Sequence, residues 1–168
     1  TTPEVVGRFF GEARAVQAIG HPNIVQIYRC GRERGVHFLV MELLEGETLA
    51  EVLEREGQLP LERTLEIVKS MSSALDASHR KGIVHRDLKP ENVFITPSGP
   101  KVLDFGIAKL FDDEGGQKLT RTGAIMGTPL YMSPEQIRAG HQPDPTFDIY
   151  AIGVVLYECL AGRPPFGG

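Results

Sequence analysis

The stretch from Ile83 to Gly106, IVHRDLKPENVFITPSGPKVLDFG, constrains the fold more than any other part of the chain. Its two short apolar runs, VFIT and KVLDF, are typical of strands, and the Ser-Gly pair between them is typical of a turn. Asp87 and Asn92 lie five positions apart before the first run, and Asp104 lies near the end of the second. The stretch therefore combines a base, a lysine and two hard oxygen ligands in one strand–turn–strand unit.

Length and composition indicate one globular domain. The chain has 168 residues, of which 41% are hydrophobic and 24% charged, which is enough to bury a core. A net charge of −4 gives no reason to expect nucleic acid as a partner. Cys30 and Cys159 both lie in apolar runs, and we expect free buried thiols in a reducing compartment in preference to a disulfide. The sequence shows no signal-peptide pattern and no apolar run of about 18 residues, so we expect no membrane segment and a cytoplasmic location.

Helical and strand-like patterns alternate before the central stretch. The spacing predicts a helix over residues 3–19, strands over 24–30 and 36–41, and a helix over 60–81. The last of these shows an apolar stripe at Leu61, Leu65, Val68 and Leu75.

Capping-box patterns predict the starts of two short helices. Thr48 with Glu51, and Ser133 with Gln136, have the spacing of capping boxes. Residues 148–160 are apolar on nearly all faces, which predicts a helix buried in the core.

The pattern H-R-D-L-x-x-x-N from His85 to Asn92, followed by D-F-G from Asp104 to Gly106, is the protein-kinase signature. The chain resembles a protein kinase catalytic domain over residues 3–165, nearly its whole length, and is most similar to the bacterial Ser/Thr kinases of eukaryotic type. The resemblance implies an α+β, bilobal fold. Residues 1–41 would be the remainder of the N-lobe, with one helix and two strands, 42–47 the hinge, and 48–168 a mainly helical C-lobe without its last helices.

The same resemblance gives four side chains catalytic roles. Asp87 would accept the proton of the substrate hydroxyl, and Lys89 would reach the transferred phosphate. Asn92 and Asp104 would bind Mg²⁺ or Mn²⁺. A single aspartate could equally be a solvated turn residue, but the signature positions match together and in order. The implied reaction is transfer of the γ-phosphate of ATP to serine or threonine hydroxyls of proteins, because DLKPEN is typical of Ser/Thr kinases.

A nucleotide site is also implied. The segment FLVMELLEGETL resembles the kinase hinge, in which Met41 would guard the back of the adenine pocket. The backbone of Glu42 and Leu44 would bond adenine, and Phe94 would form the pocket floor. Glu12 looks like the glutamate that pairs with the catalytic lysine of the N-lobe, with a solvated helix glutamate as the alternative.

Residues 109–126 lose the apolar pattern and predict a mobile loop. An anionic phosphate would satisfy the cation of Arg86 beside the catalytic base, so we expect Thr122, and after it Thr120, to be autophosphorylation sites. Lys109 falls where the family often places a second phosphate contact. Autophosphorylation in trans would require self-association. Unmodified loop hydroxyls are the alternative.

The segment GTPLYMSPE resembles the one that docks the substrate backbone in kinases. Thr128 would bond toward the catalytic aspartate and lysine. Glu135 stands where the family buries a glutamate against an arginine, and Asp148 where an aspartate fixes the backbone of the His-Arg turn.

Two kinase elements find no match. No glycine-rich loop and no V-A-I-K lysine precede Glu12, and the pattern stops just after residues 148–160. We therefore expect a kinase fragment that is weak or inactive alone, exposes apolar patches, and belongs to a protein that could be anchored to a membrane elsewhere. The alternative is a pseudokinase-like interaction module, which the intact Asp87, Asn92 and Asp104 disfavour.

Overall fold

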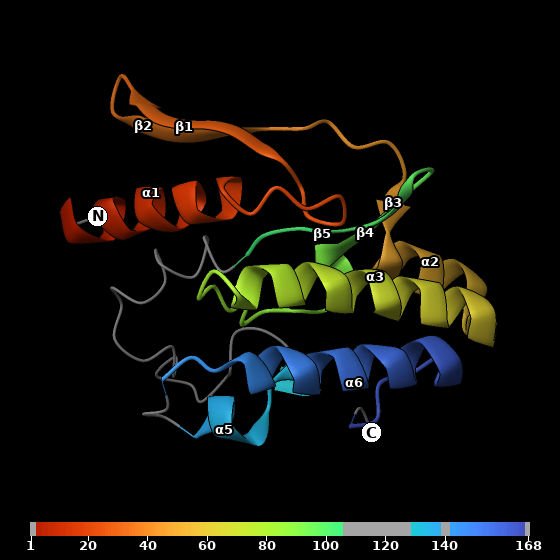
Figure 1. The fold of residues 1–168 in the computed structure, drawn as a ribbon. Coiled ribbons are helices and arrows are strands. Elements are labelled where there is room, and N and C mark those ends of the chain that lie inside the picture. Colours follow the sequence, from red (N-terminus) through yellow and green to blue (C-terminus); the bar gives the residue numbers. More distant parts are fainter. Residues whose placement is uncertain (1–2, 106–128, 139–141, 167–168) are drawn as a thin grey trace.

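The computed structural model describes residues 3–105, 129–138 and 142–166, without the side chains of residues 3–6, 8, 9 and 12. These residues form an α+β fold in which a helix and a β-hairpin lie over a larger, mainly helical part (Figure 1). The helices are α1 (Pro3–Gln17), α2 (Leu49–Glu56), α3 (Leu61–His79), α5 (Pro134–Ile137) and α6 (Pro145–Ala161), with short 3₁₀ turns at Pro90–Asn92 and Pro129–Tyr131. The strands are β1 (Ile27–Glu33), β2 (Val36–Met41), β3 (Glu47–Thr48), β4 (Val93–Thr96) and β5 (Gly99–Val102).

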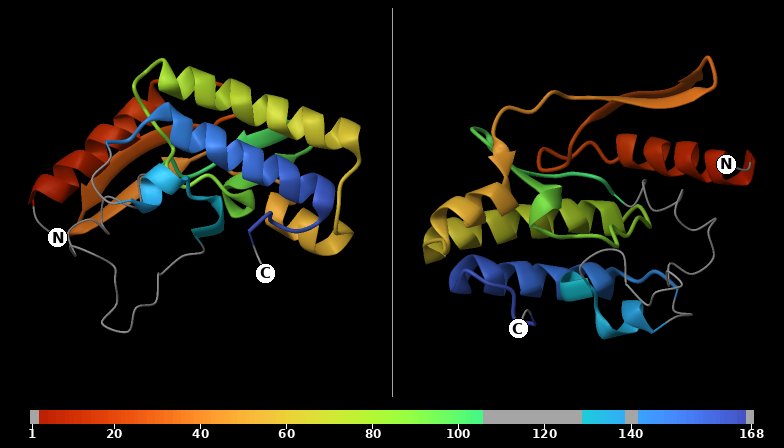
Figure 2. Two further views of the ribbon diagram at one scale, coloured as in Figure 1. Left: turned by 90° about the horizontal axis from the view of Figure 1, so that it is seen from below. Right: turned by 180° about the vertical axis from the view of Figure 1, so that it is seen from behind.

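The first two strands form an antiparallel hairpin against which α1 packs (Figure 2). The expected strand over 24–30 is shifted toward the C-terminus, because the hairpin closes on only Arg34 and Gly35. Both residues have positive φ, +49° and +85°, as tight two-residue hairpin turns require.

The segment between α1 and β1 connects the hairpin of β1 and β2 to the rest of the molecule through hydrogen bonds. Val25 N donates to Val102 O at 3.0 Å, and Val102 N donates to Asn23 O at 2.8 Å. The ring of His21 bonds Ser73 Oγ of α3 at 3.1 Å. Strand β5, which leads into Asp104, is thereby held from the N-terminal side.

Both predicted capping boxes are confirmed. At the start of α2, Thr48 Oγ1 accepts from Glu51 N while Glu51 Oε2 accepts from Thr48 N. At the start of α5, Ser133 and Gln136 make the reciprocal pair. Local hydrogen bonds therefore set both helix starts, as their spacing predicts.

The predicted apolar stripe of α3 is wrong in its first half. Leu61 and Leu65 are 55% and 52% exposed, and the buried face runs one position away from them. Helix α3 packs against α6 and β5, and these partners select the face. The buried residues of α3 are Thr64, Ile67, Met71, Ala74, Leu75 and Ser78.

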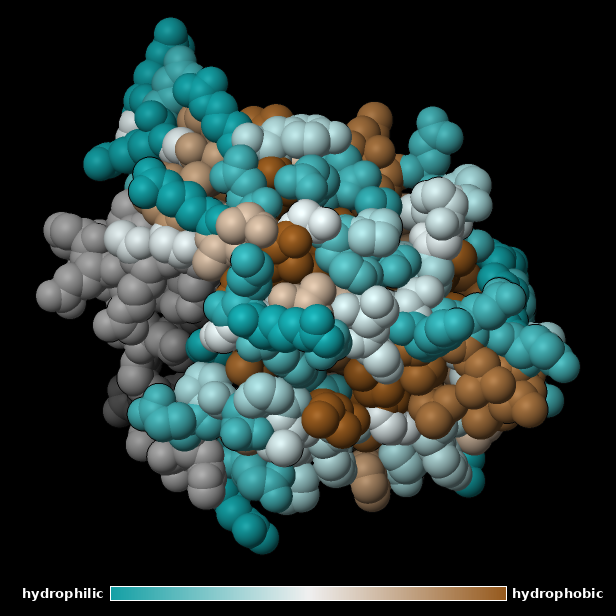
Figure 3. All heavy atoms as spheres, in the orientation of Figure 1, coloured by the Kyte–Doolittle hydropathy of each residue, from teal (hydrophilic) through white to brown (hydrophobic). Residues whose placement is uncertain are grey.

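Helix α6 is less enclosed than its sequence predicts. Its buried face includes Phe147, Ala151 and Val155, whereas Ile149 and Tyr157 are 62% and 43% exposed. Apolar surface lies over the neighbouring ends of α3 and α6 (Figure 3), where Leu61, Leu65 and Leu160 are exposed. This agrees with the expected exposed apolar patches.

One buried cluster joins the layers, from Ala13 and Val16 of α1 through Met71 of α3 to Val155 of α6. Both cysteines are free, as predicted, but Cys30 is half-buried and only Cys159 is buried. Burial raises the pKa of the Cys159 thiol to about 11. Among the helices described, none has the length and hydropathy needed to cross a membrane.

Candidate functional site

The loop from Ile83 to Asn92, between α3 and β4, contains the candidate base, and its backbone is tightly constrained. Arg86 has φ +67°, a left-handed conformation that costs a non-glycine residue about 1–3 kcal/mol. Asp148 of α6 counters this cost: its Oδ2 accepts from His85 N at 2.8 Å and its Oδ1 from Arg86 N at 2.9 Å. The expected neighbours are therefore in contact across 62 residues of sequence.

A histidine that no sequence pattern indicates completes this contact. His79, the last residue of α3, places Nε2 2.7 Å from Asp148 Oδ2. Asp148 is only 1% exposed, and a buried carboxylate needs polar partners for both oxygens. Since His79 and Asp148 are 69 positions apart, no local pattern could have revealed the pair.

Asp87 and Asn92 are in direct contact. Asn92 Nδ2 donates to the backbone oxygen of Asp87 at 2.8 Å and lies 3.4 Å from Asp87 Oδ2. Asn92 is 8% exposed and ends the 3₁₀ turn that begins at Pro90, while Lys89 is the half-buried residue before that turn. With its nitrogen facing Asp87, the amide of Asn92 offers Oδ1 as its oxygen ligand.

The ring of His85 links the candidate base to the strand that leads into Asp104. His85 Nε2 bonds Leu103 O at 2.7 Å, and Asp87 N donates to His85 Nδ1 at 3.3 Å. The ring also packs against Phe105, with centroids 4.8 Å apart. Asp104 itself is exposed and has φ +50°, so its carboxylate lies at the surface just beyond the buried ring.

Burial lowers the pKa of His85 and outweighs the nearby carboxylates. The neutral ring has one donor for Leu103 O and one acceptor for Asp87 N, which matches both contacts.

This neutral state predicts a pH dependence of stability. Unfolded His85 titrates near pH 6.5, so below that pH the unfolded chain binds a proton that the folded chain does not. We therefore expect the free energy of unfolding to decrease as the pH is lowered below about 6.5. The contribution of His85 to this decrease is up to roughly 1.4 kcal/mol per pH unit. Urea unfolding at several pH values measures the slope, and His85→Gln should remove that share of it. Equal slopes in both proteins would contradict the prediction.

The candidate hinge is anchored through a charged pair that no sequence pattern indicates. Lys101 Nζ of β5 lies 2.7 Å from Glu42 Oε1, which also accepts from Gln26 N at 2.7 Å. Burial raises the pKa of Glu42, but the hydrogen bonds from Lys101 and Gln26 prevail and lower it. Glu42 N is occupied by Gln26 O at 2.9 Å, which leaves the Glu42 carbonyl as its backbone group for a ligand.

The other residues of the candidate hinge and pocket differ in their exposure. Met41 is 42% exposed at the end of β2, and Leu44 is half-buried. Phe94 of β4 is half-buried and lies opposite Thr48 and Lys101 in the sheet. Gly46 is required here, because a Cβ would lie 2.0 Å from Ile95 O.

Other predicted site residues are only partly described. Arg86 is half-buried, and Glu135 is exposed at the start of α5. Glu12 lies on α1, but its side chain is outside the described residues, as are Lys109, Thr120, Thr122 and Thr128.

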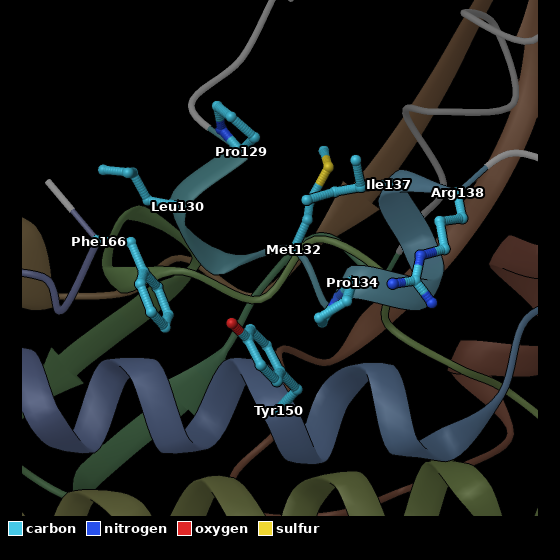
Figure 4. Close-up of a pocket in the computed structure, with 8 residues that line it drawn as sticks. All are labelled: Pro129, Leu130, Met132, Pro134, Ile137, Arg138, Tyr150 and Phe166. Atoms are coloured by element: carbon cyan, nitrogen blue, oxygen red, sulfur yellow. The ribbon is translucent and has the colours of Figure 1, made fainter.

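Two hollows adjoin the segment from Pro129 to Arg138. One, of about 380 Å³, is mainly apolar; Tyr150 of α6 points into it beside Phe166, with the rings stacked at 6.5 Å (Figure 4). The other, of about 260 Å³, is lined in part by Glu54, Glu91 and Glu158. Tyr131 donates to Glu158 at 2.6 Å, and burial raises the pKa of Glu158.

Asp87 and Asn92 lie in one loop and Asp104 lies just after β5, and these are the residue types that a metal-dependent phosphotransferase uses. Comparison with known families agrees: the protein kinase domain model matches residues 3–168. The chain belongs to the protein kinase family.

Its relatives include bacterial Ser/Thr kinases. The chain is 43% identical over 172 residues to the serine/threonine-protein kinase PknA of Mycobacterium tuberculosis, covering 99% of this chain and 39% of that protein. It is 46% identical over 168 residues to the serine/threonine-protein kinase pkn3 of Myxococcus xanthus, covering 96% of this chain and 30% of that protein. The chain thus spans less than half the length of these curated relatives.

Proposed function

We propose that this chain is the catalytic part of a Ser/Thr protein kinase, which transfers the γ-phosphate of ATP to hydroxyls of protein substrates. The contact of Asn92 with Asp87, beside the strand that leads into Asp104, is the main support. The names of the relatives support the same reaction. The ATP-rich cytoplasm is the proposed location.

In this proposal Asp87 accepts the hydroxyl proton of the substrate, and Lys89 neutralises charge on the transferred phosphate. Phosphoryl transfer depends mostly on positioning and electrostatics, so the fixed backbone before Asp87 matters in addition to its carboxylate. Asp148 and the ring of His85 supply that positioning through the contacts described above.

The side chains fit a Mg²⁺ or Mn²⁺ site shared with substrate phosphates. Asp104 offers an exposed carboxylate and Asn92 a neutral amide oxygen, the hard ligands that these cations prefer. Within residues 3–105, 129–138 and 142–166, no three His, Cys, Asp or Glu side chains form a ready-made cage, and such ions usually rely on one or two carboxylates plus phosphates. When bound, the cation would neutralise phosphate charge.

The adenine would bond the backbone carbonyl of Glu42 and the backbone of Leu44, with Met41 behind it and Phe94 beneath it. The occupied amide of Glu42 supports a role for its carbonyl. Glu12 would pair with the catalytic lysine of a complete N-lobe.

Control by loop phosphorylation is a further part of the proposal. Thr122 or Thr120 would carry the phosphate, with Arg86 and Lys109 as its cationic partners. Self-association would allow one copy to modify another, and Thr128 would help to dock the substrate.

The full-length protein, incubated with Mg²⁺ and ATP and followed by intact-mass spectrometry, tests this function. We expect added phosphates that map to Thr122 or Thr120, and phosphate transfer to casein as a generic acceptor. The double variant Thr120→Ala/Thr122→Ala should lose most transfer activity to casein. Undiminished activity in that variant would exclude the regulatory role of these threonines. If the wild-type protein neither incorporates phosphate nor binds ATP, the kinase function is excluded.

A further inference from the structure

The side-chain amide of Gln136 is bonded at both ends. Its Oε1 accepts from Ser133 N at 3.1 Å, which closes the capping box of α5. Its Nε2 donates to the backbone oxygen of Arg86 at 3.0 Å. The Ser133 amide can only donate and the Arg86 carbonyl can only accept, so these partners fix the orientation of the Gln136 amide.

The second bond completes the support of the left-handed turn before Asp87. Asp148 of α6 holds the N–H groups of His85 and Arg86, at 2.8 and 2.9 Å. Gln136 of α5 holds the carbonyl of Arg86, which is the peptide group that leads directly into Asp87. The two helices thus bond different polar groups of the same turn.

We propose that Gln136 is a positioning residue for Asp87, linking the start of α5 to the catalytic turn. The inference rests on the proposed kinase function of Asp87 and assigns a role to a residue outside the kinase signature. Because α5 directly follows the segment from Pro129 to Ser133, a displacement of that segment would be transmitted to Arg86 through a single amide. The capping bond and the positioning bond use different atoms, so they can be separated by substitution.

Gln136→Glu separates them in the full-length protein. A carboxylate still accepts from Ser133 N and keeps the helix cap, but it cannot donate to Arg86 O and instead faces it with negative charge. We expect kcat for casein phosphorylation to fall about tenfold near pH 8, while KM for ATP and Tm stay close to wild type.

The pH profile provides the decisive readout. A protonated carboxyl has the shape and the donor of the amide, so the ratio of kcat in Gln136→Glu to kcat in wild type should rise as pH falls from about 8 to about 5. Groups that are present in both proteins change both kcat values in the same way, so their titration does not affect this ratio. On the facing loop and the elements around it, such groups include His79, His85, Arg86, Asp87, Lys89, Tyr131, Glu135, Arg138 and Asp148.

Two further variants serve as controls. Gln58→Glu makes the same chemical change at an exposed position between α2 and α3, and its ratio to wild type should be flat with pH. Ser133→Ala removes the hydroxyl side of the capping box, so it should lower Tm without introducing the pH-dependent ratio.

Hydrogen exchange distinguishes failure of this inference from failure of the proposed function, because it requires no catalysis. The amides of His85 and Arg86 should exchange several-fold faster in Gln136→Glu than in wild type near pH 8. If the wild-type protein transfers phosphate but Gln136→Glu matches it in kcat at every pH, the positioning role is overturned. If the wild-type protein transfers none, faster exchange still supports the link from Gln136 to the turn, and unchanged exchange overturns it.

Discussion

Asp87→Asn is expected to lower kcat of the full-length protein by a factor of about 10²–10⁴, the usual contribution of a general base. Asparagine keeps the size of the side chain but cannot take up the hydroxyl proton. The backbone oxygen of Asp87, which receives the 2.8 Å bond from Asn92, is unchanged by the substitution. The affinity for ATP and Tm should therefore stay close to wild type, so the loss should appear in kcat alone.

Asp76→Asn is the matched control for this experiment. Asp76 lies on α3, its side chain is 60% exposed, and its partner is Arg80 at 2.9 Å. An exposed pair of this kind contributes little, so we expect wild-type kcat, Tm and ATP affinity. Radiolabelled phosphate transfer to casein measures both variants. Retention of more than about a tenth of the wild-type kcat in Asp87→Asn would exclude Asp87 as the general base.

The sequence predicted those parts of the fold that depend on near neighbours. The capping boxes at Thr48 and Ser133 are complete within four residues, so their spacing alone was sufficient. The bounds of the first strand were predicted too early, because the positive φ of Arg34, which places the turn, is unusual for a non-glycine residue and gave no signal.

Faces and contacts set by distant parts of the chain could not be predicted in the same way. Leu61 and Leu65 follow helical spacing, but α6 and β5 bury the face one position away, including Thr64 and Ile67. Periodicity gives the presence of an amphipathic helix, whereas its packing partners select which residues are covered.

The candidate site shows the same division. Asp87, Asn92 and Asp104 were identified because they share a short signature. The residues that bond the turn before Asp87 were harder to predict. The role of Asp148 was inferred only from the family resemblance, and the contacts of His79 and Gln136 with this region were not predicted. Gln136 was predicted as a cap, and its second bond spans 50 residues. When one side chain takes part in both a local motif and a distant contact, the sequence pattern indicates only the local motif.

Asp148→Asn should have the largest combined effect on stability and activity. Both oxygens of Asp148 accept backbone N–H bonds at a site that is 1% exposed, and His79 lies 2.7 Å from one of them. An asparagine offers one acceptor to these two donors and turns an NH₂ group toward the other. We expect the free energy of unfolding to fall by about 2–4 kcal/mol, and kcat to fall at least tenfold, because the left-handed Arg86 loses its support.

Asp144→Asn provides the control within the same helix. Asp144 is the exposed N-cap of α6, where its Oδ1 accepts from Thr146 N at 2.8 Å, and asparagine caps helices about as well as aspartate. Urea unfolding and phosphate transfer should both be near wild type in this variant. Equal stability losses in Asp148→Asn and Asp144→Asn would contradict a special role for the buried carboxylate. If Asp148→Asn loses stability but its folded fraction keeps the wild-type kcat, Asp148 stabilises the fold and has no role in positioning the catalytic turn.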